Sequence, residues 1–235
     1  MATFEERVEG VTGFTITGSA TTPNHDELTE FLRDGVLDVT SRWIAIKPEQ
    51  ADLFMRETAT TATNGYATGG AQVISVIREN ASDGDTDGSL AWRECRKVPA
   101  SFQSRVVDSD SFHYASRYNP AYIIDTAGTV NVYPTPDGTD DGYRIFYVNE
   151  EPRDVTNNAN LAYNHSDINY FPNDKIYLVV LYASIRSLEA MQQDLIVDKE
   201  DVELTQAIQV LIANLKQEYD IAFTAPLQAA KAQGG

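Results

Sequence analysis

Hydrophobic residues recur at helical spacing in three long stretches of the chain. The first stretch starts after Asn24, where Glu27 completes a capping-box-like pair, and ends near Trp43. The second covers residues 171–193 and is apolar on two faces, which predicts a helix buried by neighbours on both sides. The third follows Asp198 and has a single stripe. Its members are Leu204, Ala207, Ile208, Leu211, Ile212, Leu215 and Tyr219. We therefore predict three long helices, with the second at the centre of a bundle.

Polar residues and prolines mark the expected ends of these helices. Asn173 or Asp174 can cap the N–H groups at the start of the second helix. Pro48 favours a short helix after the first one, because proline suits the first helical turn. Pro226 is expected to end the third helix, since it has no N–H group to donate, and to leave a frayed tail.

The hydrophobic period changes to that of strands from residue 71 onward. Residues 73–79 and 91–98 are β-branched or alternating, and the Asp/Gly cluster between them is typical of a hairpin tip. Residues 121–125 and 129–133 form a second expected hairpin. A fifth strand over residues 143–149 is apolar on both faces, which predicts a central position in a small sheet.

This order of elements predicts an α+β fold, a helical bundle with an inserted small antiparallel β-sheet or barrel module. Residues 101–118 are expected to hold a short helix with Phe102 and Val106 inward. Residues 150–170 show no clear hydrophobic period, and we expect this segment and both termini to be arms that order against a partner. The expected parts are an N-terminal arm or edge strand (1–23), helical bundle segments (24–70 and 173–223, with a loop over 58–70), the β module (71–149), an extended arm (150–172) and a flexible tail (224–235).

The formal net charge of −17, from 18 basic and 35 acidic residues, makes a protein that grips duplex DNA improbable, because the surface repels phosphates. It is compatible with a protein that DNA passes without binding. Cys95 is the only cysteine, so no intrachain disulfide forms. No signal peptide or membrane-spanning run is expected, and the chain is expected to be soluble and cytoplasmic when synthesised.

The most specific chemical motif is DGDTDGSLAWRE, residues 83–94. Asp83, Asp85 and Asp87 occupy the first, third and fifth positions of a calcium-loop pattern, and Gly88 permits the sharp turn. The flanking segments are expected to be strands, whereas a calcium hand needs helices. The alternative is a solvated hairpin tip in which Asp and Gly favour turn geometry.

No catalytic arrangement is recognisable in the sequence. None of His25, His113 and His165 belongs to a serine-nucleophile elbow or a zinc motif, and a structural role is expected for His113 among its aromatic neighbours. Cys95 is expected to be a buried, inert thiol. No phosphate-binding glycine loop is present in the sequence, and the other paired carboxylates are typical of solvated turns. We expect neither enzymatic activity nor a cofactor.

Several stretches together resemble the head–tail connectors, or neck adaptors, of tailed bacteriophages. They are FLRDGVLDVTSRW, WRECRKVPASFQSRV, HYASRYNPAYIID, VNVYPTP and FPNDKIYLVVLYASIRSLEAM, and the resemblance covers residues 26–223. It implies a helical bundle with a β insertion and no enzymatic activity. It also implies a ring, commonly of twelve copies, that lies beneath the portal and extends the DNA channel toward the tail.

The implied partners are further copies of the chain, the portal protein, and tail tube, nozzle or other neck proteins, with genomic DNA passing unbound. The implied location is the virion neck or tail, after assembly in the cytoplasm of the bacterial host. One alternative is a different tail or neck component, such as a tail terminator, a nozzle or a baseplate subunit. Another is a calcium-binding module that uses Asp83, Asp85 and Asp87.

Overall fold

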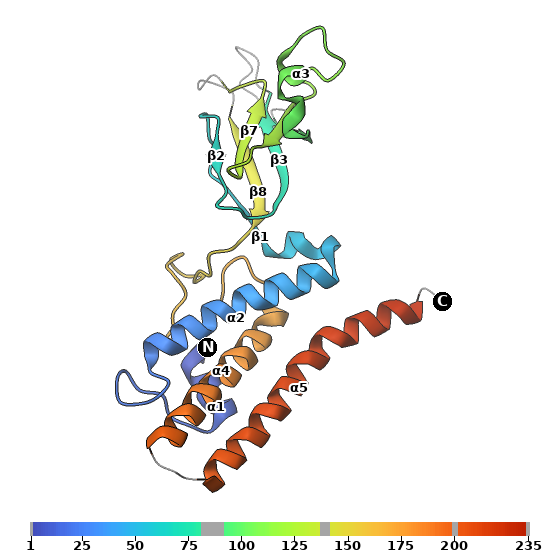
Figure 1. The fold of residues 1–235 in the computed structure, drawn as a ribbon. Helices are drawn as coiled ribbons and strands as arrows, with labels where there is room; N and C mark the ends of the chain where they lie inside the picture. Colours follow the sequence, from blue (N-terminus) through green and yellow to red (C-terminus); the bar gives the residue numbers. More distant parts are fainter. Residues whose placement is uncertain (1, 81–91, 137–141, 199–201, 234–235) are drawn as a thin grey trace. The chain divides into compact units, whose positions relative to one another are not determined.

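The computed structural model describes residues 2–80, 92–136, 142–198 and 202–233, and it divides into two compact units. Residues 1–54 and 150–235 form the helical unit, and residues 55–149 form the β unit inserted between them (Figure 1). The expected α+β class is therefore confirmed, with the strands gathered in the inserted part of the chain.

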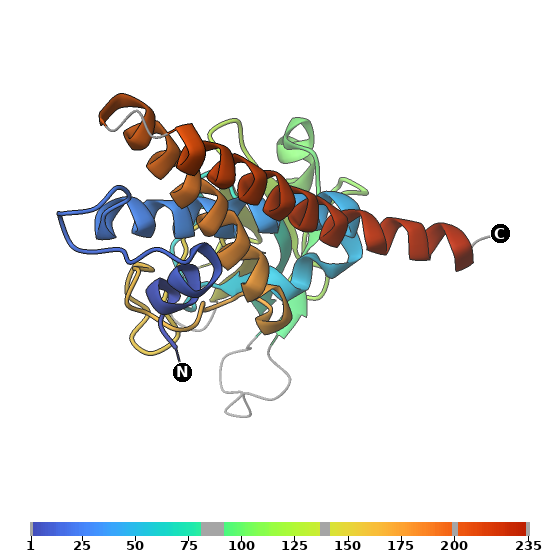
Figure 2. The ribbon, with the colours of Figure 1, turned by 90° about the horizontal axis from the view of Figure 1, so that it is seen from below.

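The helical unit is a bundle of long helices in which one helix touches all the others. Its elements are α1 (Phe4–Thr12), α2 (His25–Ile46), the 3-10 helices η1 (Pro48–Phe54) and η3 (Asn173–Lys175), α4 (Ile176–Asp198) and α5 (Val202–Gln233). Helix α4 contacts α1, α2 and α5 (Figure 1, Figure 2). The sequence prediction that the central helix is buried by neighbours on more than one side is confirmed.

Apolar residues on both predicted faces of α4 are buried. The set comprises Ile176, Leu178, Val179, Val180, Leu181, Ala183, Ile185 and Leu188. A glycine lets α2 approach α4 closely: a Cβ at Gly35 would lie 3.1 Å from Cδ1 of Tyr182 and 3.3 Å from Cγ1 of Val179. Such distances leave little room for any side chain at this crossing.

Two predicted helix ends differ from the structure. Neither Asn173 nor Asp174 caps α4, because both lie inside η3, whose N-cap is Pro172 with no side-chain hydrogen bond. Helix α5 continues past Pro226 to Gln233, so the predicted stop at Pro226 is wrong. An interior proline removes one backbone hydrogen bond, and the alanines and Leu227 around it favour continuation of the helix.

The N-terminal segment is a helix and not the strand or partner-ordered arm that we expected. Thr3 and Glu6 form a capping box, in which each side chain accepts from the other residue's backbone N–H. Phe4 and Val8 are fully buried, so α1 supplies part of the core. The helix has nine residues and only two fully buried apolar positions, so its sequence is too short to show a helical period clearly.

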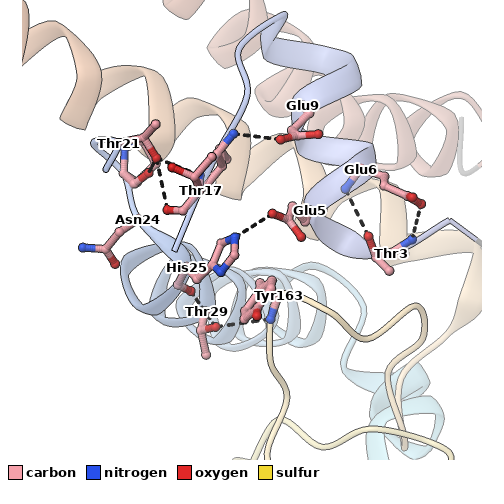
Figure 3. Close-up of polar contacts among 12 residues, drawn as sticks. Thr3, Glu5, Glu6, Glu9, Thr17, Thr21, Asn24, His25, Thr29 and Tyr163 are labelled. Atoms are coloured by element: carbon pink, nitrogen blue, oxygen red, sulfur yellow. Dashed lines mark hydrogen bonds and ion pairs between the residues drawn. The ribbon is translucent and has the colours of Figure 1, made fainter. Parts of the chain in front are cut away.

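Polar contacts join α1 to the rest of the helical unit (Figure 3). Glu5 Oε1 lies 2.7 Å from His25 Nε2 at the start of α2, and the His25 ring stacks on Tyr163 at 3.9 Å between ring centroids. The backbone N–H of Phe4 donates to the carbonyl of His165 at 2.8 Å. Three segments that are distant in sequence therefore meet at one end of the bundle.

Residues 150–172 have no long regular element, as their lack of periodicity predicted, but they are ordered within the chain itself. Leu161 and Ile168 are buried, and Arg33 Nε donates to the carbonyl of Leu161 at 2.9 Å. Phe171 packs edge-to-face against Phe54, with 5.4 Å between centroids. The expectation that this segment orders only against a partner is wrong for its buried part, because Leu161, Ile168 and Phe171 pack within its own bundle.

Among the described residues, eight strands form two open four-stranded sheets, where we predicted one five-stranded sheet or barrel. One sheet has the order β1 (Met55–Glu57), β8 (Tyr143–Val148), β3 (Val73–Glu79), β4 (Trp92–Glu94). The other has the order β2 (Tyr66–Ala67), β7 (Thr129–Tyr133), β6 (Ala121–Ile124), β5 (Arg96–Lys97). All pairs are antiparallel except β5 with β6.

The predicted 91–98 strand belongs to both sheets, because the chain changes sheet at Cys95. The Cys95 N–H donates to Val76 in the first sheet, and the Arg96 N–H donates to Pro120 beside the second. The predicted central position of β8 is confirmed, since it lies between β1 and β3, and Met55 pairs with Val148. The stretch 58–70, predicted to be a loop, contains the short strand β2.

The core of the β unit lies between the two sheets and beneath a short helical segment. The residues between the sheets are Val76, Cys95, Tyr122, Val130, Val132, Tyr143 and Ile145. Arg78 is fully buried beside them, and it donates from Nε to the carbonyl of Pro134 at 3.0 Å and from Nη1 to that of Glu79 at 2.7 Å. On the β6–β7 sheet, η2 (Ala100–Phe102) and α3 (Gln103–Val107) place Val106 and Phe102 inward, as predicted.

Candidate functional site

The predicted calcium ligands Asp83, Asp85 and Asp87 lie outside the described residues, so the site stays a prediction. Within the described ranges, no group of three His, Cys, Asp or Glu side chains could hold a metal ion. No helix in this part of the chain is both long and apolar enough to cross a membrane.

The three histidines lie in separate places and have structural contacts. His25 pairs with Glu5, as described above. His113 packs edge-to-face on Phe102, with 4.9 Å between ring centroids. His165 Nδ1 accepts a hydrogen bond from the backbone N–H of Ala162 at 3.0 Å. These contacts agree with the structural role that the sequence predicted for His113.

Cys95 is the buried thiol that the sequence predicted. It is 4% exposed in the core between the sheets. Burial raises its pKa to about 12, and the nearby Arg78 charge offsets only part of that rise. A thiol that stays protonated at neutral pH is a poor nucleophile and a poor metal ligand, so Cys95 contributes packing to the β unit.

The exposed large apolar side chains of the described part of the β unit all lie in residues 107–118, from the last residue of α3 toward β6, which we call the aromatic loop (Figure 1). Phe112 is fully exposed, and the other exposed members are Val107, Tyr114 and Tyr118. Clustered exposed aromatic side chains on a soluble domain usually mark a surface that binds another protein.

The aromatic loop is held in one conformation by backbone hydrogen bonds. The N–H of Ala115 donates to Val106 at 2.9 Å, and the N–H of Tyr114 donates to Ser111 at 3.0 Å. Arg96 Nη2 donates to the carbonyls of His113 and Tyr114 from the adjacent strand. Because the backbone is already fixed, a partner that binds Phe112 does not have to order the loop.

The helical unit carries an apolar groove with a volume of about 660 Å³ between α1, α4 and α5. Its apolar lining consists of Val11, Ile176, Tyr177, Val180 and Leu181, and its polar lining consists of Arg7, Asp167, Asn173 and Glu218. Tyr177 is 51% exposed, whereas Val180 and Leu181 are buried. We refer to this feature as the apolar groove.

Polar contacts fasten α5 to α2 on the other side of the bundle. The Tyr219 hydroxyl donates to Asp38 Oδ2 at 2.7 Å, and burial together with this bond raises the pKa of Tyr219 far above its usual value. Arg42 Nε lies 2.8 Å from Asp38 Oδ2, and its guanidinium lies over the rings of Tyr219 and Phe223. We call this set the α2–α5 contact.

A second ion pair joins α5 to α4. Lys216 Nζ lies 2.8 Å from Glu189 Oε1, and Arg186 Nη1 lies 2.7 Å from Glu189 Oε2. Partial burial alone would raise the pKa of Glu189, but the hydrogen bonds and charges of Lys216 and Arg186 outweigh it and lower that pKa. The carboxylate is therefore ionised at neutral pH and connects the two helices.

The two units differ sharply in charge. The helical unit contains 23 acidic and 10 basic side chains, an acidic excess of 13. The β unit contains 12 acidic and 8 basic side chains, an excess of 4. Most of the net negative charge therefore belongs to the helices, which periodicity and composition considered over the whole chain did not reveal.

The aromatic loop and the apolar groove were missed by sequence reasoning. The loop has a partial signal, because Phe112, Tyr114 and Tyr118 lie close together without helical or strand period. The groove has none, since residues of α1 and α4 that are more than 160 positions apart form it together. Only the fold brings those positions to one surface.

Comparison with known proteins identifies a family. No curated protein sequence matches the chain significantly. The sequence profile described as SU10 adaptor protein matches residues 13–230, which include almost all of both units. The chain therefore belongs to the SU10 adaptor protein family, a family of bacteriophage head–tail adaptors, and the resemblance noted in its sequence is confirmed.

Proposed function

We propose that this adaptor forms a ring between the portal and the tail of the virion and extends the DNA channel. The match to the SU10 adaptor protein family over most of the chain carries the proposal, and structural proteins of this kind work by binding other proteins. The exposed aromatic loop and the apolar groove support it, because both are surfaces suited to protein contacts.

The test combines the full-length chain with the portal protein in solution. We expect a closed ring, of twelve copies, bound to the portal, and native mass spectrometry with electron microscopy would give the copy number. A chain that remains monomeric and does not bind the portal would overturn the proposal. Binding to tail proteins without binding to the portal would instead indicate a tail terminator, a nozzle or a baseplate subunit.

We further propose that the helical unit faces the passing DNA. Its acidic excess of 13 repels phosphates, so that DNA slides through without being held. Assembled rings are expected to bind no duplex DNA at low salt. Replacing exposed acids of this unit with lysine, for example Glu30 and Glu203, should produce salt-dependent binding. Tight DNA binding by the unmodified ring would contradict this assignment.

We also propose that the adaptor has no catalytic role. We propose that it assembles in the host cytoplasm. Asp83, Asp85 and Asp87 are retained as a proposed Ca²⁺ site in the Asp-rich segment between residues 83 and 94. Calorimetric titration with Ca²⁺ should release heat with the unmodified chain and none with an Asp85→Asn variant. Absence of heat at millimolar Ca²⁺ in the unmodified chain would remove the site.

A further inference from the structure

The aromatic loop and the apolar groove are complementary in kind, and every copy of the chain carries one of each. The loop presents a fully exposed Phe112 on a fixed backbone in the β unit. The groove is an open depression of about 660 Å³ in the helical unit, lined by aliphatic side chains and Tyr177. An exposed aromatic ring gains most when it enters an apolar depression from which its binding expels the water.

We propose that Phe112 of one copy inserts into the apolar groove of the next copy and forms a head-to-tail contact between neighbours. This inference rests on the proposed ring and names one of its contacts. Two different surfaces of the same chain meet in such a heterologous contact, and repeating it closes into a ring when the rotation between copies allows. It uses the loop and the groove on every copy, so no copy in the closed ring leaves either surface open to water.

Charges around the two surfaces fit this pairing. Asp108 and Asp110 lie on the exposed approach to Phe112, and Arg7 lies at the rim of the groove. Arg105 is exposed on α3 beside the loop, and Glu218 and Asp167 also line the groove. Each surface therefore carries charges of both signs beside its apolar part, so opposite charges are available to pair across the contact.

A second copy explains both surfaces better than a tail protein bound to the loop alone. A tail protein that held Phe112 would leave Ile176, Tyr177 and Leu181 lining an open groove on every subunit. Binding between copies also places the β unit of one subunit, with its smaller acidic excess of 4, against the more acidic helical unit of the next. Two acidic helical units in the same position would repel each other.

The test uses two full-length variants, one on each side of the contact. Phe112→Asp changes the inserted side chain, and Tyr177→Asp changes the exposed side of the groove. Both residues are exposed, so circular dichroism should report unchanged folding. Val155→Asp is the matched control, because Val155 is 50% exposed against 51% for Tyr177 and belongs to neither surface. Each variant is mixed with the portal protein, and native mass spectrometry counts the copies.

We expect the control to form rings like the unmodified chain, and each contact variant to need at least a tenfold higher concentration for assembly. A mixture of the two contact variants retains one intact contact per pair, because the Phe112→Asp copy keeps its groove and the Tyr177→Asp copy keeps its loop. The mixture should therefore give heterodimers but no closed rings.

Three outcomes overturn the inference. They are full rings from both contact variants, no heterodimer in the mixture, and lower thermal stability of the isolated monomer, which would mean that Phe112 binds within its own chain. Normal rings that fail to bind a tail protein would assign the loop to that protein instead. In each of these cases the proposed ring survives, whereas failure of the unmodified chain to assemble on the portal overturns the ring itself.

Discussion

The helical unit and the β unit are held together by different kinds of contact. Four helices bury aliphatic side chains along α4, and surface ion pairs from Arg42 to Asp220 and from Glu189 to Lys216 join α5 to its neighbours. The β unit has short strands, and a fully buried arginine joins the end of β3 to the carbonyl of Pro134 beyond β7. The helical unit is therefore held mainly by many similar apolar contacts, whereas the core of the β unit also includes a buried arginine and its hydrogen bonds.

The comparison can be measured because the chain has one tryptophan in each unit, Trp43 in the helical unit and Trp92 in the β unit. Hydrogen exchange resolves the same two units by segment. A substitution in one unit should change the unfolding of that unit and leave the other unchanged, unless the two unfold together.

The largest effect is expected from Arg78→Ala in the β unit. The substitution leaves the partly buried carbonyls of Pro134 and Glu79 without these donors, and it opens a cavity beside the core between the sheets. We expect the free energy of unfolding of the β unit to fall by about 3 kcal/mol. The exposed Lys97→Ala variant is the control, with a change of about 0.5 kcal/mol or less. Equal loss in both units would show that they unfold as one.

The next largest effect is expected from Gly35→Val in the helical unit. The new side chain would meet Tyr182 and Val179 at the crossing of α2 and α4, where a Cβ alone already lies within 3.4 Å of both. Overpacking of this kind costs about 2 kcal/mol. Chemical denaturation followed through Trp43 should show the loss, while exchange in the β unit stays unchanged. An unaltered denaturation midpoint would mean that α2 and α4 can move apart without a loss of stability.

A smaller loss of stability in the helical unit is expected from Tyr219→Phe in the α2–α5 contact. Phenylalanine keeps the packing against Phe223 but removes the hydrogen bond to Asp38, which still pairs with Arg42. Removing one hydrogen bond to a carboxylate costs about 1.5 kcal/mol. Faster exchange confined to α5 would support the contact as its main attachment to α2. Faster exchange across all helices would argue against that.

The smallest effect concerns acid stability. The pKa of Glu189 is lower in the folded chain than its usual value of 4.5, so folding is favoured by its ionisation above that pH. This contribution is lost as the pH falls below 4.5 toward the folded pKa. The thermal stability of the helical unit should therefore fall as the pH is lowered from 6 to 3. The Glu189→Gln variant should show a smaller fall. A pH profile unaltered by the variant would exclude Glu189 as a contributor.

Features that depend on neighbouring residues were predictable from the sequence. The capping box of Asn24 and Glu27, the strand Val73–Glu79 and the two apolar faces of α4 all appear as expected. Their signals span one or two turns or a single strand, so local pattern decides them. The acidic character of the whole chain was equally visible, since it needs no fold.

Features that depend on distant residues were not predictable. The change of sheet at Cys95 is decided by Val76 and Pro120, which the alternating pattern of residues 91–98 does not reveal. The order of residues 150–172 depends on contacts with α2 such as Arg33 to Leu161. The apolar groove is likewise a product of the bundle, and only the aromatic residues of the loop left a trace in the sequence.

The pairing of Met55 with Val148 has a consequence for how the chain can change over evolutionary time. These residues are the first residue of the β unit and the last but one, and opposed residues of antiparallel strands lie about 5 Å apart. The β unit therefore leaves and rejoins the helices at nearly one point. A short turn from Phe54 to Glu150 could replace it, so an insertion of another size could be exchanged there without repacking the bundle.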